Sequence, residues 1–104
     1  HFERNATLIS QFLNKLWAEK GLSQNTLRSY EYDLKSLSRW SSSEMSRGLE
    51  AADRKMILGY LSNLLEKGIS SRSASRRLSS VKSFYKFLKR IIAIQISAIL
   101  SYFF

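Results

Sequence analysis

The stretch from Ser70 to Arg90 (SSRSASRRLSSVKSFYKFLKR) concentrates side chains that can bind phosphate. It contains seven basic residues and no acidic one. An arginine guanidinium donates hydrogen bonds in a planar fork that matches phosphate oxygens, and a lysine ammonium neutralises phosphate charge. Apolar residues recur in the same stretch at helical spacing, so one helix would have a core face and a cationic face. Because like charges on the cationic face repel one another, the pattern predicts a polyanionic partner.

The excess of positive charge is confined to this part of the chain. Residues 1–66 contain nine Lys or Arg and all eight Asp or Glu, whereas residues 67–90 contain eight Lys or Arg and no carboxylate. The 104 residues carry a formal net charge of +9, so nearly all of the excess lies in residues 67–90. This concentration favours a nucleic acid as the partner, with an anionic membrane surface as the second choice. A basic helix face that is only solvated is the third interpretation.

The residues that catalysis or metal binding would need do not form a recognisable pattern. His1 is the only histidine and there is no cysteine, so no Ser-His pair, thiolate centre or disulfide can be assembled. The carboxylates lack metal-loop spacing, and the four glycines form no phosphate loop. Aromatic residues on apolar stripes are expected in the core rather than at a site; these are Trp17, Tyr30, Trp40, Tyr60 and Tyr85. The chain alone is therefore predicted to have no catalytic residue, cofactor or metal.

Four helices with short connections are expected to position the basic side chains. The chain has no proline and only four glycines, which favours helices over a turn-rich β fold. Apolar residues at helical spacing predict a first helix over residues 6–20, ended by Gly21, and a second helix over residues 24–41. The serine-rich residues 41–50 are predicted to form a loop.

N-caps are predicted where the remaining helices begin. Ser23 precedes the second helix, Asp53 precedes the third, and Ser70 or Ser71 precedes the fourth. Each helix carries an apolar stripe, and four such stripes are expected to pack into a small all-α bundle. The stripes are Ile9, Phe12, Leu13, Leu16 and Trp17; Leu27, Tyr30, Leu34 and Leu37; Met56, Ile57, Tyr60, Leu61, Leu64 and Leu65; and Ala74, Leu78, Val81, Tyr85 and Leu88.

Two of these helices carry a cationic face opposite the apolar stripe. On the fourth helix that face comprises Arg72, Arg76, Lys82, Lys86 and Arg90, interleaved with Ser75, Ser79, Ser80 and Ser83. On the second helix it comprises Arg28, Tyr32, Lys35 and Arg39. Arg77 lies at the border of the stripe, so its stem is expected to pack and its guanidinium to emerge at the edge. Two cationic faces favour a bundle that lays two helices against duplex DNA, whose major groove admits an α-helix.

The last residues, Ile91 to Phe104 (IIAIQISAILSYFF), contain no charge. An exposed segment of this composition would aggregate, so it is expected to pack on something. It could cover the core as a fifth segment, helical or extended, or it could dock another domain or subunit. It is too short to span a bilayer, and Phe2 to Thr7 does not read as a signal peptide. A cytoplasmic location is therefore expected, which the lack of cysteine also fits.

The second and fourth helices resemble those of a known family. Residues 21–40 (GLSQNTLRSYEYDLKSLSRW) resemble the L-S-x-N-T-x-x-x-Y-x-x-D-L signature of Xer-type tyrosine recombinases, which belong with the phage integrases. Residues 9–20 are similar to the first helix of the XerD-like branch of that family. The fourth helix resembles its counterpart in the same family through Ser73, Arg77, Leu78, Ser79, Val81, Phe84, Tyr85 and Leu88.

This resemblance implies the family's N-terminal core-binding domain, a SAM-like orthogonal bundle of four helices that forms half of a clamp around DNA. The domain would occupy residues 1–90, and residues 91–104 would be an apolar tail that is a remnant or replacement of the interdomain linker. In the family, the second and fourth helices meet the major groove of the recombination half-site. Carried over by position, the expected DNA-binding residues are Gln24, Thr26, Arg28, Ser29, Arg72, Ser73, Arg76 and Ser80, with Lys82 and Lys86 as phosphate contacts.

The resemblance also implies partners. Strand cleavage in the family belongs to a separate C-terminal domain, none of whose motifs occurs here, so this chain would be a non-catalytic part of a recombinase. The implied partners are double-stranded DNA, that catalytic domain and partner recombinase protomers, in chromosome partition, phage integration or mobile-element transfer. The alternative is a helical protein-interaction module that docks through the apolar tail. A membrane-surface binder would need an exposed aromatic wedge opposite the basic faces, which these helices lack.

Overall fold

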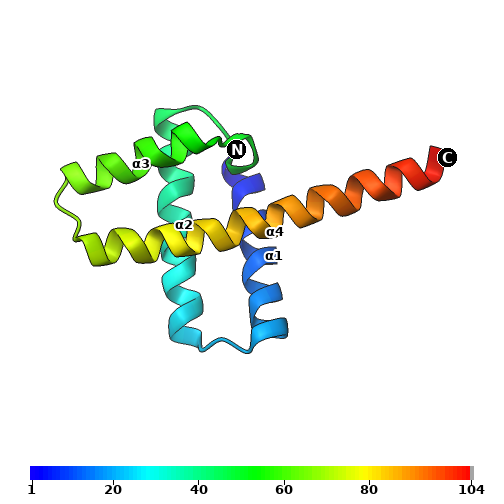
Figure 1. Cartoon of the computed structure of the whole chain (residues 1–104), viewed down its shortest axis with the longest axis horizontal. Coiled ribbons are helices and arrows are strands. Elements are labelled where there is room, and N and C mark those ends of the chain that lie inside the picture. Colours follow the sequence, from blue (N-terminus) through cyan, green and yellow to red (C-terminus); the bar gives the residue numbers. More distant parts are fainter. Residues whose placement is uncertain (104) are drawn as a thin grey trace.

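The computed structural model describes residues 1–103, and most of them are helical (Figure 1). The α-helices are α1 (Phe2–Lys20), α2 (Gln24–Glu44), α3 (Arg54–Glu66) and α4 (Ser71–Phe103), and a short 3-10 turn, η1, spans Leu49–Ala51. No strand occurs in this part of the chain. The predicted all-α fold with four helices is confirmed.

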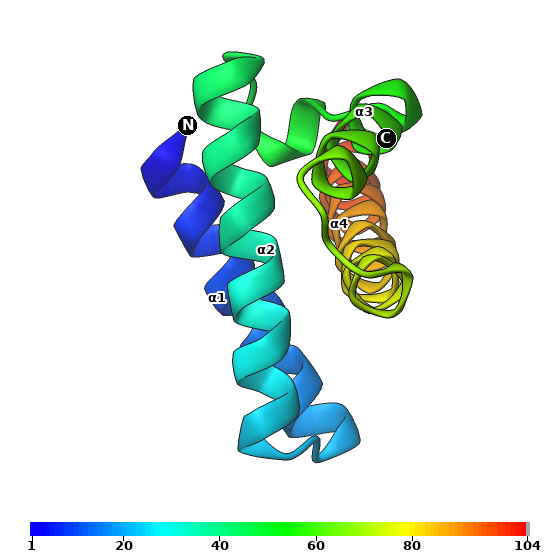
Figure 2. The same cartoon turned by 90° about the vertical axis from the view of Figure 1, so that its left-hand side faces the viewer.

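The helices form two antiparallel pairs that lie across each other. α1 and α2 run side by side in opposite directions, and α3 runs antiparallel to the first half of α4 (Figure 1). Viewed nearly along α4, the α3–α4 pair lies against one side of the α1–α2 pair (Figure 2). α4 contacts each of the other three helices. It is therefore the element through which the two halves of the orthogonal bundle are joined.

A single apolar core fills the space between the two pairs. The ring of Phe12 on α1 lies against Phe84 and Phe87 of α4, with centroids 5.5 and 5.4 Å apart. Burial of each such side chain stabilises the fold by about 2 kcal/mol, so these contacts are a large part of what holds α1 to α4. Other core residues are Leu8, Ile9, Leu16, Leu34, Leu37, Leu49, Tyr60, Val81 and Leu88, with Leu13, Leu27, Tyr30, Ile57, Leu61 and Leu64 packed around them. The central positions of the four predicted stripes are confirmed.

The large aromatic residues at the edges of the stripes differ in burial. Trp40 packs against Tyr60 with ring centroids 5.4 Å apart, as a core residue should. Tyr85 donates a hydrogen bond of 2.7 Å to the carbonyl of Leu49, and burial raises the pKa of its hydroxyl. Trp17, in contrast, is 64% exposed, so its predicted place in the core is wrong. At about 100° per residue, Trp17 is turned well away from the line of α1 that faces α4.

Side-chain caps begin three of the helices where the sequence predicts them. Ser23, Asp53 and Ser70 each accept a hydrogen bond from the backbone N–H three residues later, at 3.2, 2.8 and 3.1 Å. Each cap satisfies a donor that the first helical turn leaves unpaired. Gly21 ends α1 at φ 58°, a left-handed conformation that glycine adopts without strain.

The first two helices are longer than predicted. α1 begins at Phe2 rather than at residue 6, and α2 continues to Glu44. The fully buried Asn5 explains the early start, because its amide donates to the hydroxyl of Ser38 at 2.9 Å and its carbonyl accepts the N–H of Leu49 at 3.0 Å. These bonds fix the first turn of α1 to α2 and η1.

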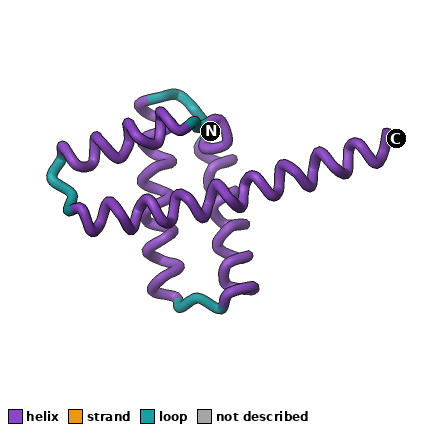
Figure 3. Tube along the Cα trace, in the orientation of Figure 1, coloured by secondary structure: helices purple, strands orange, loops and turns teal. Residues whose placement is uncertain are grey.

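α4 does not end with the bundle. It runs without a break to Phe103 (Figure 3), and its 33 residues span about 50 Å at 1.5 Å per residue. This length matches the longest dimension of the molecule, 52 Å. Residues 92–103, here called the C-terminal arm, are exposed and project beyond the bundle (Figure 1). Of the two alternatives for this segment, covering the core is wrong for residues 92–103, and docking on another domain or subunit stays a prediction. No glycine or proline ends α4 near the bundle edge, so the helix continues. Phe104 lies outside the described residues.

A bilayer-spanning helix is absent from residues 1–103.

Candidate nucleic-acid interface

A buried carboxylate joins the two helices that carry the cationic faces. Asp33 of α2 is 1% exposed and lies where α2 and α4 cross. Its Oδ1 accepts a hydrogen bond of 2.8 Å from Nη2 of Arg76, and its Oδ2 accepts one of 3.2 Å from the hydroxyl of Ser80. A second guanidinium is also close, because Nε of Arg77 lies 3.8 Å from Oδ1. Both oxygens of the carboxylate are thus engaged by α4.

Arg77 extends this polar cluster to α3. Its Nη1 donates to the hydroxyls of Ser36 and Tyr60, both at 3.0 Å, and the hydroxyl of Tyr60 donates to Ser36 at 2.8 Å. The guanidinium also lies over the ring of Tyr32, 5.4 Å from the centroid. The side chain of Arg77 is only 11% exposed, so the prediction that its guanidinium emerges at the edge is wrong. The hydroxyls of α2 and α3 thus accept from one terminal nitrogen, whereas the buried Nε makes no hydrogen bond within residues 1–103 and has only the charge of Asp33 nearby to compensate it.

These contacts define what we call the α2–α4 crossing, namely Asp33, Ser36, Arg76, Arg77 and Ser80. A buried charge is tolerated only when it is paired and hydrogen-bonded, so the cluster constrains the relative position of the two helices. One carboxylate faces two guanidiniums, which leaves the crossing with a positive excess. Arg76 is the member that reaches the surface, with a side chain 47% exposed.

The predicted DNA-binding residues of α4 fall into three groups. Arg72, Arg76, Lys82 and Lys86 are exposed. Ser73 is half-buried, and its N–H and hydroxyl both bond to the cap residue at the start of the helix. Ser80 is fully buried, with its hydroxyl donating within the protein, so it cannot contact DNA directly. Ser80 is thereby corrected from a candidate DNA contact to a residue that positions Asp33.

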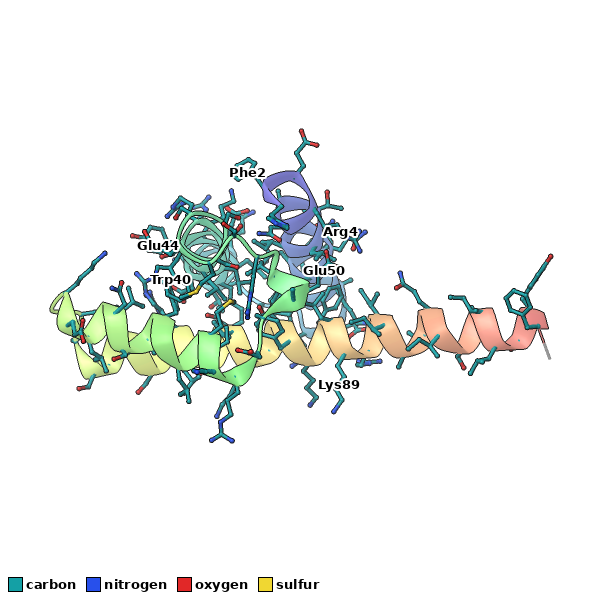
Figure 4. The ribbon with its side chains drawn as sticks, turned by 90° about the horizontal axis from the view of Figure 1, so that it is seen from above. Phe2, Arg4, Trp40, Glu44, Glu50 and Lys89 are labelled. Atoms are coloured by element: carbon teal, nitrogen blue, oxygen red, sulfur yellow. The ribbon has the colours of Figure 1, made fainter. Side chains whose placement is uncertain are left out.

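The exposed cations of α4 lie beside different helices of the bundle. Lys86 and Arg90 line a hollow beside the C-terminal half of α1, together with Lys15, Lys20 and Glu19, whose carboxylate pairs with Lys15. Lys82 lines a groove on the other side, between α3 and α4. Lys89 points away from the α1–α2 pair (Figure 4). The structure therefore brings two lysines of α1 toward the predicted interface and turns Lys82 toward its edge.

The predicted residues of α2 lie near its start. Gln24 and Arg28 are exposed, with Nη2 of Arg28 3.5 Å from Oε1 of Gln24, and they line a shallow hollow with Leu13 of α1. Thr26 and Ser29 are half-buried. The N–H of Thr26 donates to the hydroxyl of the cap residue Ser23 at 3.2 Å.

Most cations of α4 have no carboxylate partner. Ion pairs elsewhere join Lys15 to Glu19 at 3.4 Å and Lys35 to Glu31 at 3.8 Å. Among the residues that the structure describes, no carboxylate pairs with Arg72, Lys82, Lys86, Lys89 or Arg90. Nor do three metal-ligating side chains come together anywhere in residues 1–103. What this surface offers chemically is hydrogen-bond donors and positive charge.

Sequence reasoning missed the role of Asp33. A signal was present, because Asp33 lies three residues after Tyr30 and four before Leu37, on the apolar side of α2. A carboxylate in that position, in a chain whose fourth helix carries adjacent arginines, indicates a buried ion pair. The contribution of Lys15 and Lys20 had no comparable signal, since it depends on how α1 packs against α4.

Comparison with known proteins identifies the bundle. Residues 9–91 match the family described as the phage integrase N-terminal, SAM-like domain. The chain belongs to this family. Its SAM-like all-α fold and its resemblance to the XerD-like recombinases are both confirmed. No solved structure matches the chain.

Several curated relatives are named tyrosine recombinase XerD. The protein from Haemophilus influenzae is 41% identical over 88 residues, which cover 84% of this chain and 29% of the relative. The protein from Pseudomonas putida is 45% identical over 83 residues, covering 80% and 28%. The one from Staphylococcus epidermidis is 36% identical over 84 residues, covering 81% and 28%. The chain thus spans less than a third of the length of these relatives.

Proposed function

We propose that this chain is the DNA-binding part of a site-specific tyrosine recombinase and that it holds one recombination half-site through α2 and α4. Family membership and the extent of the match to XerD proteins support the class of protein. The observation that carries the choice of surface is the α2–α4 crossing, at which buried Asp33 holds the half-exposed guanidinium of Arg76 between the two helices.

Arg76 has the geometry of a positioned DNA contact. One of its terminal nitrogens is occupied by Asp33, which leaves other N–H groups free to donate to a guanine edge or a phosphate. Because the side chain is already held, less conformational entropy is lost when it binds. Ser80 helps to position Arg76 because its hydroxyl bonds to the carboxylate of Asp33. Arg77 fixes α4 against α2 and α3 through its bonds to Ser36 and Tyr60.

The remaining exposed cations supply phosphate contacts on both sides of Arg76. Arg72 and Lys86 are on α4, and Arg28 is at the start of α2, where unpaired backbone N–H groups of the first turn also favour phosphate. Lys82 lines the groove between α3 and α4, so we propose it as a peripheral phosphate contact that contributes less to DNA affinity. Gln24, Thr26, Ser29 and Ser73 lie near the N-termini of α2 and α4, where short polar side chains can contact bases or phosphates. A separate catalytic domain would complete the clamp and perform the strand cleavage.

Substitutions on α4 test this proposal with α3 as the control. Arg76→Ala is expected to weaken binding to a Xer-type half-site by about 1–3 kcal/mol, the range for a specific base contact. Lys86→Ala should weaken binding to the half-site and to a scrambled duplex equally and should reduce the salt slope by about one unit. Lys55→Ala removes the same charge from α3 and should leave both affinities within a factor of about two.

Fluorescence anisotropy with labelled duplexes measures these affinities, and circular dichroism confirms that each variant is folded. Wild-type affinity and salt slope in both Arg76→Ala and Lys86→Ala would show that this face does not bind DNA. An equal loss in Lys55→Ala would show that only net charge matters.

A further inference from the structure

A hollow of about 250 Å³ lies between the C-terminal half of α1 and the middle of α4, and four cations line it. Lys15 and Lys20 belong to α1, and Lys86 and Arg90 belong to α4. Among the lining residues that the structure describes, Glu19 alone carries a carboxylate, and this group pairs with Lys15 at 3.4 Å. What we call the α1–α4 hollow therefore carries a positive excess that Lys20, Lys86 and Arg90 share.

Apolar side chains form the wall behind these cations. Phe12 and Leu16 of α1 and Phe87 of α4 line the hollow and are buried. Little water can screen charges against such a wall, so an anion in the hollow is attracted more strongly than an anion at a flat surface. Ser83 also lines the hollow, and its half-buried side chain carries a hydroxyl that can donate a hydrogen bond to that anion.

The chemistry of the lining favours a phosphodiester. The cations and the hydroxyl can donate hydrogen bonds, and the ammonium and guanidinium groups cannot accept any. The oxygens of a phosphodiester only accept hydrogen bonds, whereas the edges of base pairs present donors as well as acceptors. The backbone of a nucleic acid therefore matches the hollow better than its bases do.

The hollow lies at one end of a polar row on α4. The row comprises Arg72, Arg76, Ser79, Ser83, Lys86 and Arg90, spaced by four, three, four, three and four residues. At about 100° per residue, this spacing keeps the side chains on one side of the helix. Arg76 and Arg90 are separated by about 21 Å along the helix axis, which corresponds to at most about six base pairs of B-DNA. A duplex that contacts Arg76 can therefore also reach the hollow.

We propose that the α1–α4 hollow binds one phosphate of the DNA backbone, with Lys20 and Arg90 as its ligands. The inference rests on the proposed function, because this phosphate belongs to the duplex that α2 and α4 hold. Lys86, one turn before Arg90, remains available for a neighbouring phosphate. The C-terminal half of α1 thereby becomes a third part of the interface, and the bound phosphate lies within about six base pairs of the pair that Arg76 contacts.

Lys20 also has a structural interpretation. It lies in the last turn of α1, where a cation interacts favourably with the helix dipole. On that interpretation, Lys20→Ala lowers the stability of the bundle, and its effect does not depend on any one phosphate of the duplex. The experiment must therefore detect a coupling between Lys20 and a single phosphate.

Methylphosphonate substitutions in a Xer-type half-site measure this coupling, because each one removes the charge of a single phosphate. Fluorescence anisotropy gives the affinity of the chain for every singly substituted duplex. At the position that occupies the hollow, the substitution should weaken wild-type binding about tenfold, because two cations lose their partner. Lys20→Ala should weaken binding to the unmodified duplex about fivefold, and the same methylphosphonate should then cost this variant only about twofold more.

Lys89→Ala is the matched control on α4. Lys89 points away from the α1–α2 pair (Figure 4) and is not among the residues that line the hollow. Lys89→Ala should keep the wild-type affinity within about twofold, and the effect of the methylphosphonate should persist in full. Because Lys20 and Lys89 are both exposed, both variants are expected to keep the fold, which circular dichroism checks.

Glu19 provides a test of opposite sign. Glu19→Gln removes the negative charge from the hollow and releases Lys15, so it should tighten duplex binding about threefold. Glu44→Gln removes the same charge at the opposite end of the α1–α2 pair and should leave the affinity unchanged. Equal gains in the two variants would contradict the inference, because they would show that net charge alone sets the affinity.

Two further results would overturn the inference while the proposed function stands. One is half-site binding that weakens in Arg76→Ala but stays at the wild-type level in Lys20→Ala. The other is a methylphosphonate profile that is the same in the wild type and in Lys20→Ala at every position. A wild-type chain that binds no duplex at low salt would overturn the proposed function itself, and this inference with it.

Discussion

Asp33 explains why α2 and α4, which are not consecutive in the chain, are held in one arrangement. Its carboxylate is buried and bonded to Arg76 and Ser80, and Arg77 is close enough to share its charge. The two arginines are not equivalent, however. Arg76 is half-exposed and can be rehydrated if its partner is lost, whereas Arg77 is buried and cannot.

This difference leads to a prediction at the residue scale. Asp33→Asn should lower the free energy of unfolding by about 3 kcal/mol, because it leaves the guanidinium of Arg77 without a counter-charge. Arg76→Ala should also lower it, because the buried carboxylate of Asp33 loses its closest counter-charge, but by less than Asp33→Asn, because Arg77 remains 3.8 Å from that carboxylate. Urea denaturation at neutral pH measures both. Equal losses in the two variants would show that Arg77 is not the residue that depends on Asp33.

At the scale of elements, local sequence signals predict the helices of the bundle. They do not predict features that depend on contacts between helices. The caps at Ser23 and Asp53 and the stop at Gly21 follow from backbone chemistry within a few residues, and the sequence predicts them well. The early start of α1 depends on bonds from Asn5 to residues 33 and 44 positions away, which no local pattern contains. The burial of Arg77 and Ser80 likewise depends on the approach of α2 and α3.

The continuation of α4 illustrates a different limit. Apolar composition indicates that a segment will be buried, but it does not say whether the surface that buries it belongs to the same chain. Residues 91–103 contain no helix breaker, so α4 continues past the bundle with its apolar side chains exposed. The structure overturns the alternative in which this segment covers the core, and it does not test the alternative in which the segment docks on another domain or subunit.

An element-scale prediction follows from this exposure. A chain ending at Ile91 should unfold with a free energy within about 0.5 kcal/mol of that of the full chain, because the arm makes no core contacts to lose. Its affinity for duplex DNA, measured at concentrations where the full chain is monomeric, should also be unchanged. The experiment combines urea denaturation with anisotropy. Loss of the fold or of DNA binding on truncation would show that the arm supports the bundle.

At the scale of the whole molecule, the cations are distributed unevenly. More of the exposed cations lie on α4 than on any other helix, and there Lys86 and Arg90 line a hollow shared with α1 and Lys82 lines the groove toward α3. The arm projects beyond α1 at the end of α4 that lies away from α3 (Figure 1).

The salt dependence of duplex binding tests the central claim most directly. If Arg28, Arg72, Arg76, Lys86 and Arg90 each neutralise one phosphate, the logarithm of the binding constant should fall with the logarithm of salt concentration with a slope of about −4 to −5. A Xer-type half-site should bind more tightly than a scrambled duplex of equal length at every salt concentration. Failure to bind either duplex at low salt, or a slope near zero, would contradict the assignment of this surface to DNA.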